Sequence, residues 1–151
     1  MNKYAKFGAM IATSTIVMFG LMYVNTYQAD HALFSETRSY MALIMGATMA
    51  VIMLLFMLGM YPSRSANIGI LAASAVVFAL ALWLVRSQQT IDDVSYMKAM
   101  IPHHSIAILT SERAQITDPR VRKLADQIIA TQRKEIAEMK ALIKDLQSKG
   151  R

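Results

Sequence analysis

Hydrophobic residues in the N-terminal part of the chain are gathered into three long runs that contain no charged side chain. The runs cover residues 7–29, 39–63 and 65–85, and about 20 predominantly apolar residues are enough to cross a bilayer as a helix. Amphipathic rings, which favour the headgroup zone, stand near the ends of the runs: Tyr23, Tyr27, Tyr40, Tyr61 and Trp83. The pattern predicts three transmembrane helices, with the lipid bilayer as a partner.

From Gln88 onward the pattern becomes charged and periodic. The sequence Thr90-Ile91-Asp92-Asp93 is a capping-box-like start, so we expect a helix from there to about Gln115. Asp118-Pro119 then supplies an N-cap and a first-turn proline for a second helix. The apolar residues of this second helix recur on one stripe: Val121, Leu124, Ile128, Ile136, Met139, Leu142, Ile143 and Leu146. A short turn between two helices makes them antiparallel neighbours.

These patterns predict an all-α protein in two parts. Residues 1–87 form a three-helix transmembrane region, and residues 88–151 form a helical hairpin. The first run is preceded by Lys3 and Lys6, as a signal peptide would be, but its length exceeds the roughly 7–15 apolar residues of a signal peptide. We therefore expect the first run to remain as an anchor.

The positive charges next to the runs favour one orientation. Lys3, Lys6 and Arg64 lie on one side of the membrane, and Arg38 and Arg86 lie on the other. Because short flanks rich in Lys and Arg stay in the cytoplasm, we expect a cytoplasmic N-terminus and an extracytoplasmic hairpin. The formal net charge is +6, and 11 of the 16 Lys and Arg residues lie in the hairpin, where acids are interspersed with the bases. That arrangement is typical of a solvated helix face, so nucleic acid is not an expected partner.

The composition excludes several kinds of chemistry. The chain has no Cys, which removes disulfides, thiolate metal sites and cysteine nucleophiles. It contains no HExxH, no glycine-rich phosphate loop, no GxSxG and no Glu-x-x-His of a di-iron bundle. We therefore do not expect an enzyme. The three runs also lack the ionisable groups that a metal transporter would need inside the membrane.

One group of residues has the spacing of a metal site. Met97, Met100 and His104 follow one another at i, i+3 and i+7, on one face of the predicted helix, and His103 stands beside them. Pro102 cannot donate an amide hydrogen bond, which predicts a kink at this point. A hairpin register that pairs Ile108 with Ile128 brings three further pairs together: His104 with Gln132, Met97 with Met139, and Met100 with Glu135.

Imidazole and thioether groups without a thiolate suit a soft ion, and Cu(I) above all. The candidate ligands are Met97, Met100, His103, His104, Glu135 and Met139. Cu(II) or Zn(II) could instead use the two histidines with Glu135. Because an imidazole ligand must be neutral, acid should weaken binding.

Simpler interpretations stay open for the same residues. Met at helical spacing often only fills a core, and an imidazole often only donates a hydrogen bond to a carboxylate such as Glu135. The hairpin would then be an assembly or partner-binding module whose Met and His side chains fill a helix interface. The methionines that recur every four residues from Met41 to Met57 fit helix packing or lipid contact better than a copper pathway. We expect His31, in the first connection, to be a solvated imidazole.

The residues around the histidine pair resemble the signature of the domain of unknown function family 305, from about Ile91 to Leu146. The matching residues are Met100-Ile101-Pro102-His103-His104-Ser105-Ile106-Ala107-Ile108, Asp118-Pro119, Leu124-Ala125, Ile128-Ile129, Gln132, Glu135-Ile136 and Met139. Members of that family are ferritin-like helical proteins, and some are periplasmic copper binders linked to copper resistance. The chain also looks like a membrane-anchored branch of the family.

The resemblance implies Met100, His103, His104 and Met139 as ligands, with Gln132 and Glu135 close by. One departure is Thr110, at a position where many members carry Met, and a missing thioether would lower the affinity for Cu(I). A hairpin supplies only half of a bundle core, so we expect a homodimer that completes a four-helix bundle. The expected function is copper storage, sequestration or delivery at the periplasmic face of a bacterial inner membrane.

Overall fold

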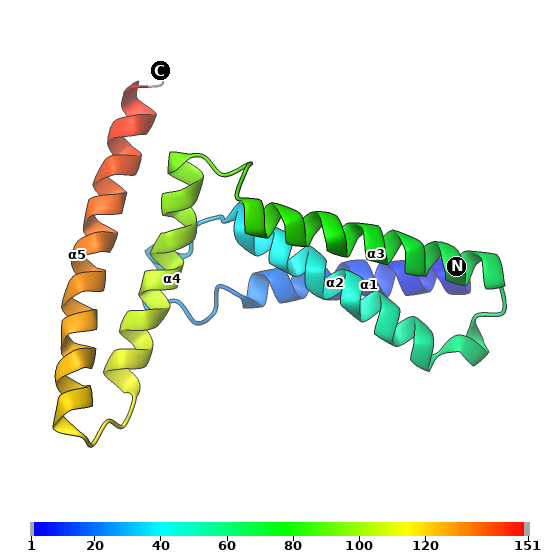
Figure 1. Cartoon of the computed structure of the whole chain (residues 1–151), viewed down its shortest axis with the longest axis horizontal. Helices are drawn as coiled ribbons and strands as arrows, with labels where there is room; N and C mark the ends of the chain where they lie inside the picture. Colours follow the sequence, from blue (N-terminus) through cyan, green and yellow to red (C-terminus); the bar gives the residue numbers. More distant parts are fainter. Residues whose placement is uncertain (1, 150–151) are drawn as a thin grey trace. The chain divides into compact units, whose positions relative to one another are not determined.

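The computed structural model describes residues 2–149, and over this range it contains five α-helices and no strand (Figure 1). The all-α prediction is therefore confirmed. The helices, with two short 3-10 turns labelled η, are α1 (Lys3–Leu21), η1 (Ala29–His31), α2 (Glu36–Phe56), η2 (Leu58–Met60), α3 (Arg64–Ser87), α4 (Asp93–Arg113) and α5 (Pro119–Lys149).

Contacts divide the chain into two units. Met1–Met22 and Thr37–Thr90 form one unit, called here the membrane unit, and Tyr23–Glu36 and Ile91–Arg151 form the other, called the hairpin unit. The sequence pattern had grouped residues 23–36 with the membrane-spanning part. In the structure these residues, called here the docked segment, pack with the hairpin instead.

The membrane unit contains three helices that are long and apolar enough to cross a membrane, namely α1, α2 and α3. Their bounds differ from those of the uncharged runs. The clearest difference is at α1, which ends at Leu21 rather than near residue 29. Residues 23–29 of that run belong to the docked segment, where the backbone N–H of Tyr27 donates to Ser105 Oγ at 2.7 Å instead of continuing a helix.

Aromatic and small side chains hold the membrane unit together. Phe7, Leu54 and Tyr61 are buried in one cluster, and the ring centroids of Phe7 and Tyr61 lie 5.3 Å apart in an edge-to-face arrangement. Met53 of α2 and Met57, which directly follows α2, pack against this cluster, as the packing interpretation of these methionines expects. Gly46 of α2 lies so close to Thr15 of α1 that a Cβ at this position would overlap the threonine side chain.

The hairpin unit consists of α4 and α5, which lie side by side and antiparallel, as predicted (Figure 1). Each of the two helices begins after an aspartate whose side chain caps its first turn. Asp92 Oδ1 accepts from the Ser95 N–H at 2.7 Å, and Asp118 Oδ1 accepts from the Arg120 N–H at 2.8 Å. The side-chain hydrogen bond and ion pair with Arg120 and the backbone hydrogen bond lower the pKa of Asp118. The N-cap of α4 is thus Asp92, two residues after the Thr90 start that the capping-box pattern suggested.

The core of the hairpin unit is built from isoleucines. Ile101 and Ile108 of α4 and Ile136 of α5 are buried, and Ile129 and Ile143 pack against them. These α5 positions recur every seven residues and form the contact line with α4. Other members of the predicted apolar stripe are exposed, namely Val121, Leu124, Leu142 and Leu146.

The docked segment corrects the expectation for His31. This residue is only 5% exposed, and its Nδ1 lies 2.9 Å from Ser105 Oγ of α4. Next to it, Lys140 of α5 donates to Asp30 Oδ2 at 2.6 Å, and this contact is the first cause of the lowered pKa of Asp30. The prediction of a solvated imidazole was wrong, because the packing of a loop against a helix far along the chain leaves no mark in the local sequence.

Candidate metal site

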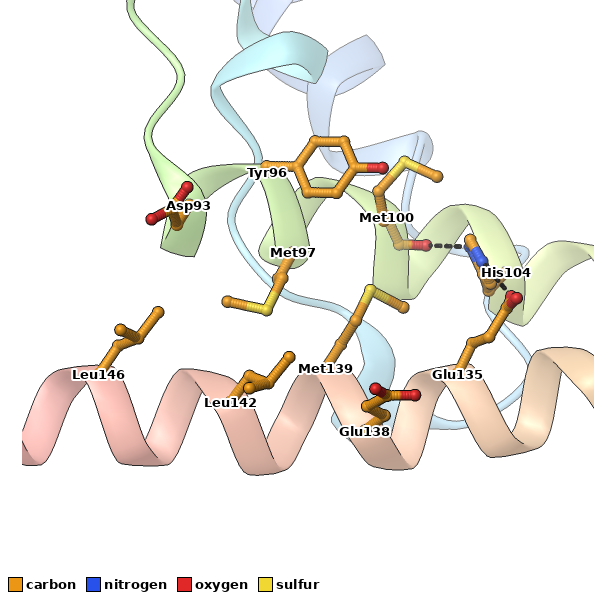
Figure 2. Close-up of a pocket in the computed structure, with 10 residues that line it drawn as sticks. All are labelled: Asp93, Tyr96, Met97, Met100, His104, Glu135, Glu138, Met139, Leu142 and Leu146. Carbon is orange, nitrogen blue, oxygen red and sulfur yellow. Dashed lines mark hydrogen bonds and ion pairs between the residues drawn. The ribbon is translucent and has the colours of Figure 1, made fainter.

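The candidate ligands meet at a cavity of about 590 Å³ between α4 and α5 (Figure 2). Five of the six predicted residues line it. Met97, Met100 and His104 come from α4, and Glu135 and Met139 come from α5. The α4 residues therefore share one face of their helix, as the helical spacing predicts, and the antiparallel hairpin brings the α5 residues to the same cavity.

The register of the hairpin differs from the one that we inferred. His104 Nε2 lies 2.8 Å from Glu135 Oε2, so His104 faces Glu135 rather than Gln132. Gln132 Nε2 donates to the same Glu135 oxygen at 3.3 Å. The inferred register used Ile128 as the contact residue, whereas the structure packs Ile129 against the buried isoleucines. An apolar stripe this wide allows more than one rotation of α5, and only the packing selects one.

The imidazole of His104 is held in one orientation. Its Nδ1 lies 2.9 Å from the backbone oxygen of Met100, one helical turn earlier. A carbonyl oxygen can only accept, so Nδ1 carries a proton and donates it there. Nε2 is then directed toward Glu135 at the cavity. Metal-ligating histidines are commonly oriented in this way, with the other nitrogen bonded to a carbonyl or carboxylate.

The residues of the site differ in how deeply they are buried. Met97 is 6% exposed, and the side chain of His104 is 12% exposed, compared with 44% for Glu135. Met100 and Met139 are half-buried. In Figure 2 the Met139 side chain reaches from α5 toward α4. The site is thus a partly covered pocket, with sulfur and imidazole nitrogen on its inner side and a carboxylate at its edge.

The structure does not bring His103 into this cavity. His103 is exposed and is not among the lining residues. Its ring still meets that of His104, with centroids 6.1 Å apart and planes at 65°. The two histidines of the pair therefore have different positions, although the sequence treats them alike.

Sequence reasoning missed the remaining lining residues, which are Asp93, Tyr96, Glu138, Leu142 and Leu146. A signal for two of them existed. Asp93 precedes Met97 by one helical turn, and Leu142 follows Met139 by three positions, so extending each face by a turn would have found both. The carboxylates do not form a cluster, since no group of three or more His, Asp or Glu side chains within residues 2–149 could hold a metal ion.

Comparison with known proteins places the chain in a family. Residues 93–151 match the family described as "Domain of unknown function (DUF305)". The chain is also 34% identical over 110 residues to the uncharacterized protein L153 of Acanthamoeba polyphaga mimivirus, which covers 69% of this chain and 68% of the viral protein. No solved structure matches the chain. The similarity to the viral protein is longer than the matched domain, and the chain belongs to the family of the domain of unknown function DUF305.

Proposed function

We propose that this protein is a membrane-anchored copper-binding protein that holds Cu(I) between α4 and α5 for storage, sequestration or delivery. The observation that carries the proposal is the meeting of three thioether side chains and one oriented imidazole at a single cavity, from Met97, Met100, Met139 and His104. Thioethers are soft ligands that select Cu(I). Cu(II) and Zn(II) prefer imidazole and carboxylate ligands, and this cavity offers only one imidazole.

The residues of the site have different parts in binding the ion. The Met100 carbonyl holds Nδ1 of His104 and leaves Nε2 as the ligand atom. A metal ion at Nε2 replaces the 2.8 Å contact with Glu135 Oε2. Because Glu135 is nearly half exposed, its carboxylate can turn toward water or contribute one oxygen ligand.

A titration of the full-length protein in detergent micelles tests this function. Cu(I) is added without oxygen and with a reductant, against a competing chelator, to the wild type and to His104→Ala and Met139→Leu. We expect stoichiometric binding by the wild type, loss of binding in His104→Ala and weaker binding in Met139→Leu. Met41→Leu is the matched control, because Met41 is an exposed methionine of α2. Equal binding by all four proteins would refute the cavity as the site.

The proposal includes an orientation in the membrane. The helices α1, α2 and α3 anchor the protein in a bacterial inner membrane, with the N-terminus in the cytoplasm and the hairpin in the periplasm. The support is the distribution of Lys and Arg at the ends of the runs. A reporter enzyme that is active only in the periplasm, fused after Lys149, should be active, and activity of a cytoplasmic reporter at that position would reverse the orientation.

A second candidate function is an assembly module in which hairpins from two copies form a four-helix bundle. The observation that favours it is the exposed apolar face of α5, where Leu124 is 56% and Leu142 is 47% exposed. The mass of the protein in detergent, measured by light scattering, should correspond to a dimer, and Leu124→Glu should shift it to the monomer. A pure assembly role predicts that this dissociation does not depend on copper, and that the wild type binds none.

A further inference from the structure

The two adjacent histidines of α4 have opposite surroundings. His104 is mostly buried, and each of its ring nitrogens has a partner, the Met100 oxygen or Glu135 Oε2. His103 is exposed, and its side chain makes no hydrogen bond with any residue between Asn2 and Lys149. Its ring nevertheless contacts that of His104. One imidazole is thus fixed at the cavity, and the other lies exposed beside it without a side-chain hydrogen bond.

We propose that His103 is a capture ligand, which takes a metal ion from a donor molecule in solution and passes it to His104 without holding the ion at equilibrium. This inference rests on the proposed copper-binding function. It concerns the rate at which the site fills and empties, whereas the cavity residues set the affinity.

Accessibility is the first argument for this role. The inner ligands are hard for a donor molecule to reach, because Met97 is 6% exposed and the His104 side chain is 12% exposed. An ion bound by a chelator or another protein is transferred most easily when a new ligand binds before the old one leaves. His103 is an imidazole that a donor can reach, and it lies in contact with the first ring of the cavity.

Conformational freedom is the second argument. An exposed side chain without hydrogen bonds loses rotamer freedom when it binds an ion, and this loss reduces its contribution to equilibrium affinity. His104 is already held in place and loses much less. A freely exposed ligand such as His103 therefore suits brief binding during transfer, and a pre-oriented ligand such as His104 suits the final site.

The transfer is a ligand exchange without redox chemistry. A nitrogen lone pair of neutral His103 forms a bond to the ion while a bond from the donor breaks. Nε2 of His104 then forms its bond, the bond to His103 breaks, and the proton shared between Nε2 and Glu135 Oε2 leaves to water. The ion keeps its oxidation state, and His103 ends without a bond to the ion, with its lone pair available again.

Exchange kinetics with a chromophoric Cu(I) chelator test the proposal, using the full-length protein in detergent. His103→Gln removes the ligand, and His103→Met restores a soft ligand of different shape. Arg113→Gln is the matched control, because Arg113 is another exposed residue of α4. We expect His103→Gln to slow uptake and release alike by about tenfold and to leave the Kd within about twofold. His103→Met should recover the wild-type rates, which a structural role for the imidazole would not produce.

Three results would overturn the proposal. Unchanged rates in His103→Gln would show that capture does not use His103. A weakened Kd with an increased release rate would make His103 a permanent ligand and leave the proposed function standing. Absence of Cu(I) binding by the wild type would remove the proposed function itself, and the equilibrium titration detects that failure before any rate is measured.

Discussion

Replacing Ser105 by Ala should release the docked segment from α4. Ser105 is fully buried, and its hydroxyl oxygen is shared by the Tyr27 N–H at 2.7 Å and by His31 Nδ1 at 2.9 Å. Alanine leaves both groups without a partner. An unsatisfied buried polar group costs about 1–3 kcal/mol, and Tyr27 is only half-buried, so water recovers part of its loss. We expect the free energy that holds the docked segment on α4 to fall by about 2–3 kcal/mol. This change increases the fraction of molecules in which the segment is detached from α4 about 30- to 140-fold.

Hydrogen exchange followed by mass spectrometry measures this opening in a peptide that covers residues 27–33. The amides of His31 and Ala32 are useful reporters, because their acceptors, the oxygens of Gln28 and Ala29, are untouched by the substitution. Faster exchange at these amides therefore reports local unfolding rather than the loss of their own acceptor. The α5 amides, which belong to a long helix, should keep their protection.

Ser111→Ala is the control, because Ser111 is on the same helix and its hydroxyl makes no hydrogen bond within the part of the chain that the structure describes. The reasoning is refuted if the 27–33 peptide exchanges equally fast in Ser105→Ala and Ser111→Ala. A double-mutant cycle with His31→Ala gives a further check. If the two side chains stabilise the docked state through their mutual contact, the double variant should lose less than the sum of the single losses.

Two further predictions concern pH and helix packing. Burial, followed by the positive charge of Lys140, lowers the pKa of His31 below its ordinary value of 6.5, so the released segment binds a proton more readily than the docked one. Docking should therefore be strongest above about pH 6.5 and weaken as the pH falls toward the lowered pKa. The protection of the amides of residues 27–33 against hydrogen exchange, corrected for intrinsic exchange, should decrease between neutral and mildly acidic pH in the wild type. In His31→Asn this protection should vary less with pH. Gly46→Ala should lower the unfolding temperature of the membrane unit in detergent, because the new Cβ overlaps Thr15, whose hydroxyl is bonded to the Ile11 oxygen, and this overlap should cost about 1–3 kcal/mol of unfolding free energy. Adding Thr15→Ala in the same chain should restore the unfolding temperature. An unchanged temperature in Gly46→Ala would show that α1 and α2 do not approach this closely.

The helices of this protein could be predicted because their signals are local. Uncharged runs mark α1, α2 and α3, and Asp92 and Asp118 supply the capping groups at the starts of α4 and α5. The end of α1 could not be predicted in the same way. The residues after Leu21 are apolar enough to continue a helix, and they leave it because the docked segment finds its hydrogen bonds on α4.

The candidate site was predictable on one helix and not across two. Met97, Met100 and His104 share a face because of the helical period, which the sequence alone contains. The partner of His104 depends on the rotation of α5, and the apolar stripe of α5 allowed both Ile128 and Ile129 as contact residues. The buried cluster selects Ile129, and Glu135 rather than Gln132 then lies opposite His104.

The sequence by itself determined the two kinds of segment in this protein, the uncharged helices and the amphipathic hairpin, because both follow from the order of polar and apolar residues. Only the tertiary structure decided the hairpin register, the separation of His103 from His104, and the burial of His31. His31 and Ser105 are 74 positions apart, and each has an ordinary polar neighbourhood in the sequence. Their hydrogen bond arises only once the docked segment packs on α4, since two buried polar groups far apart in the chain can satisfy each other only in the folded state.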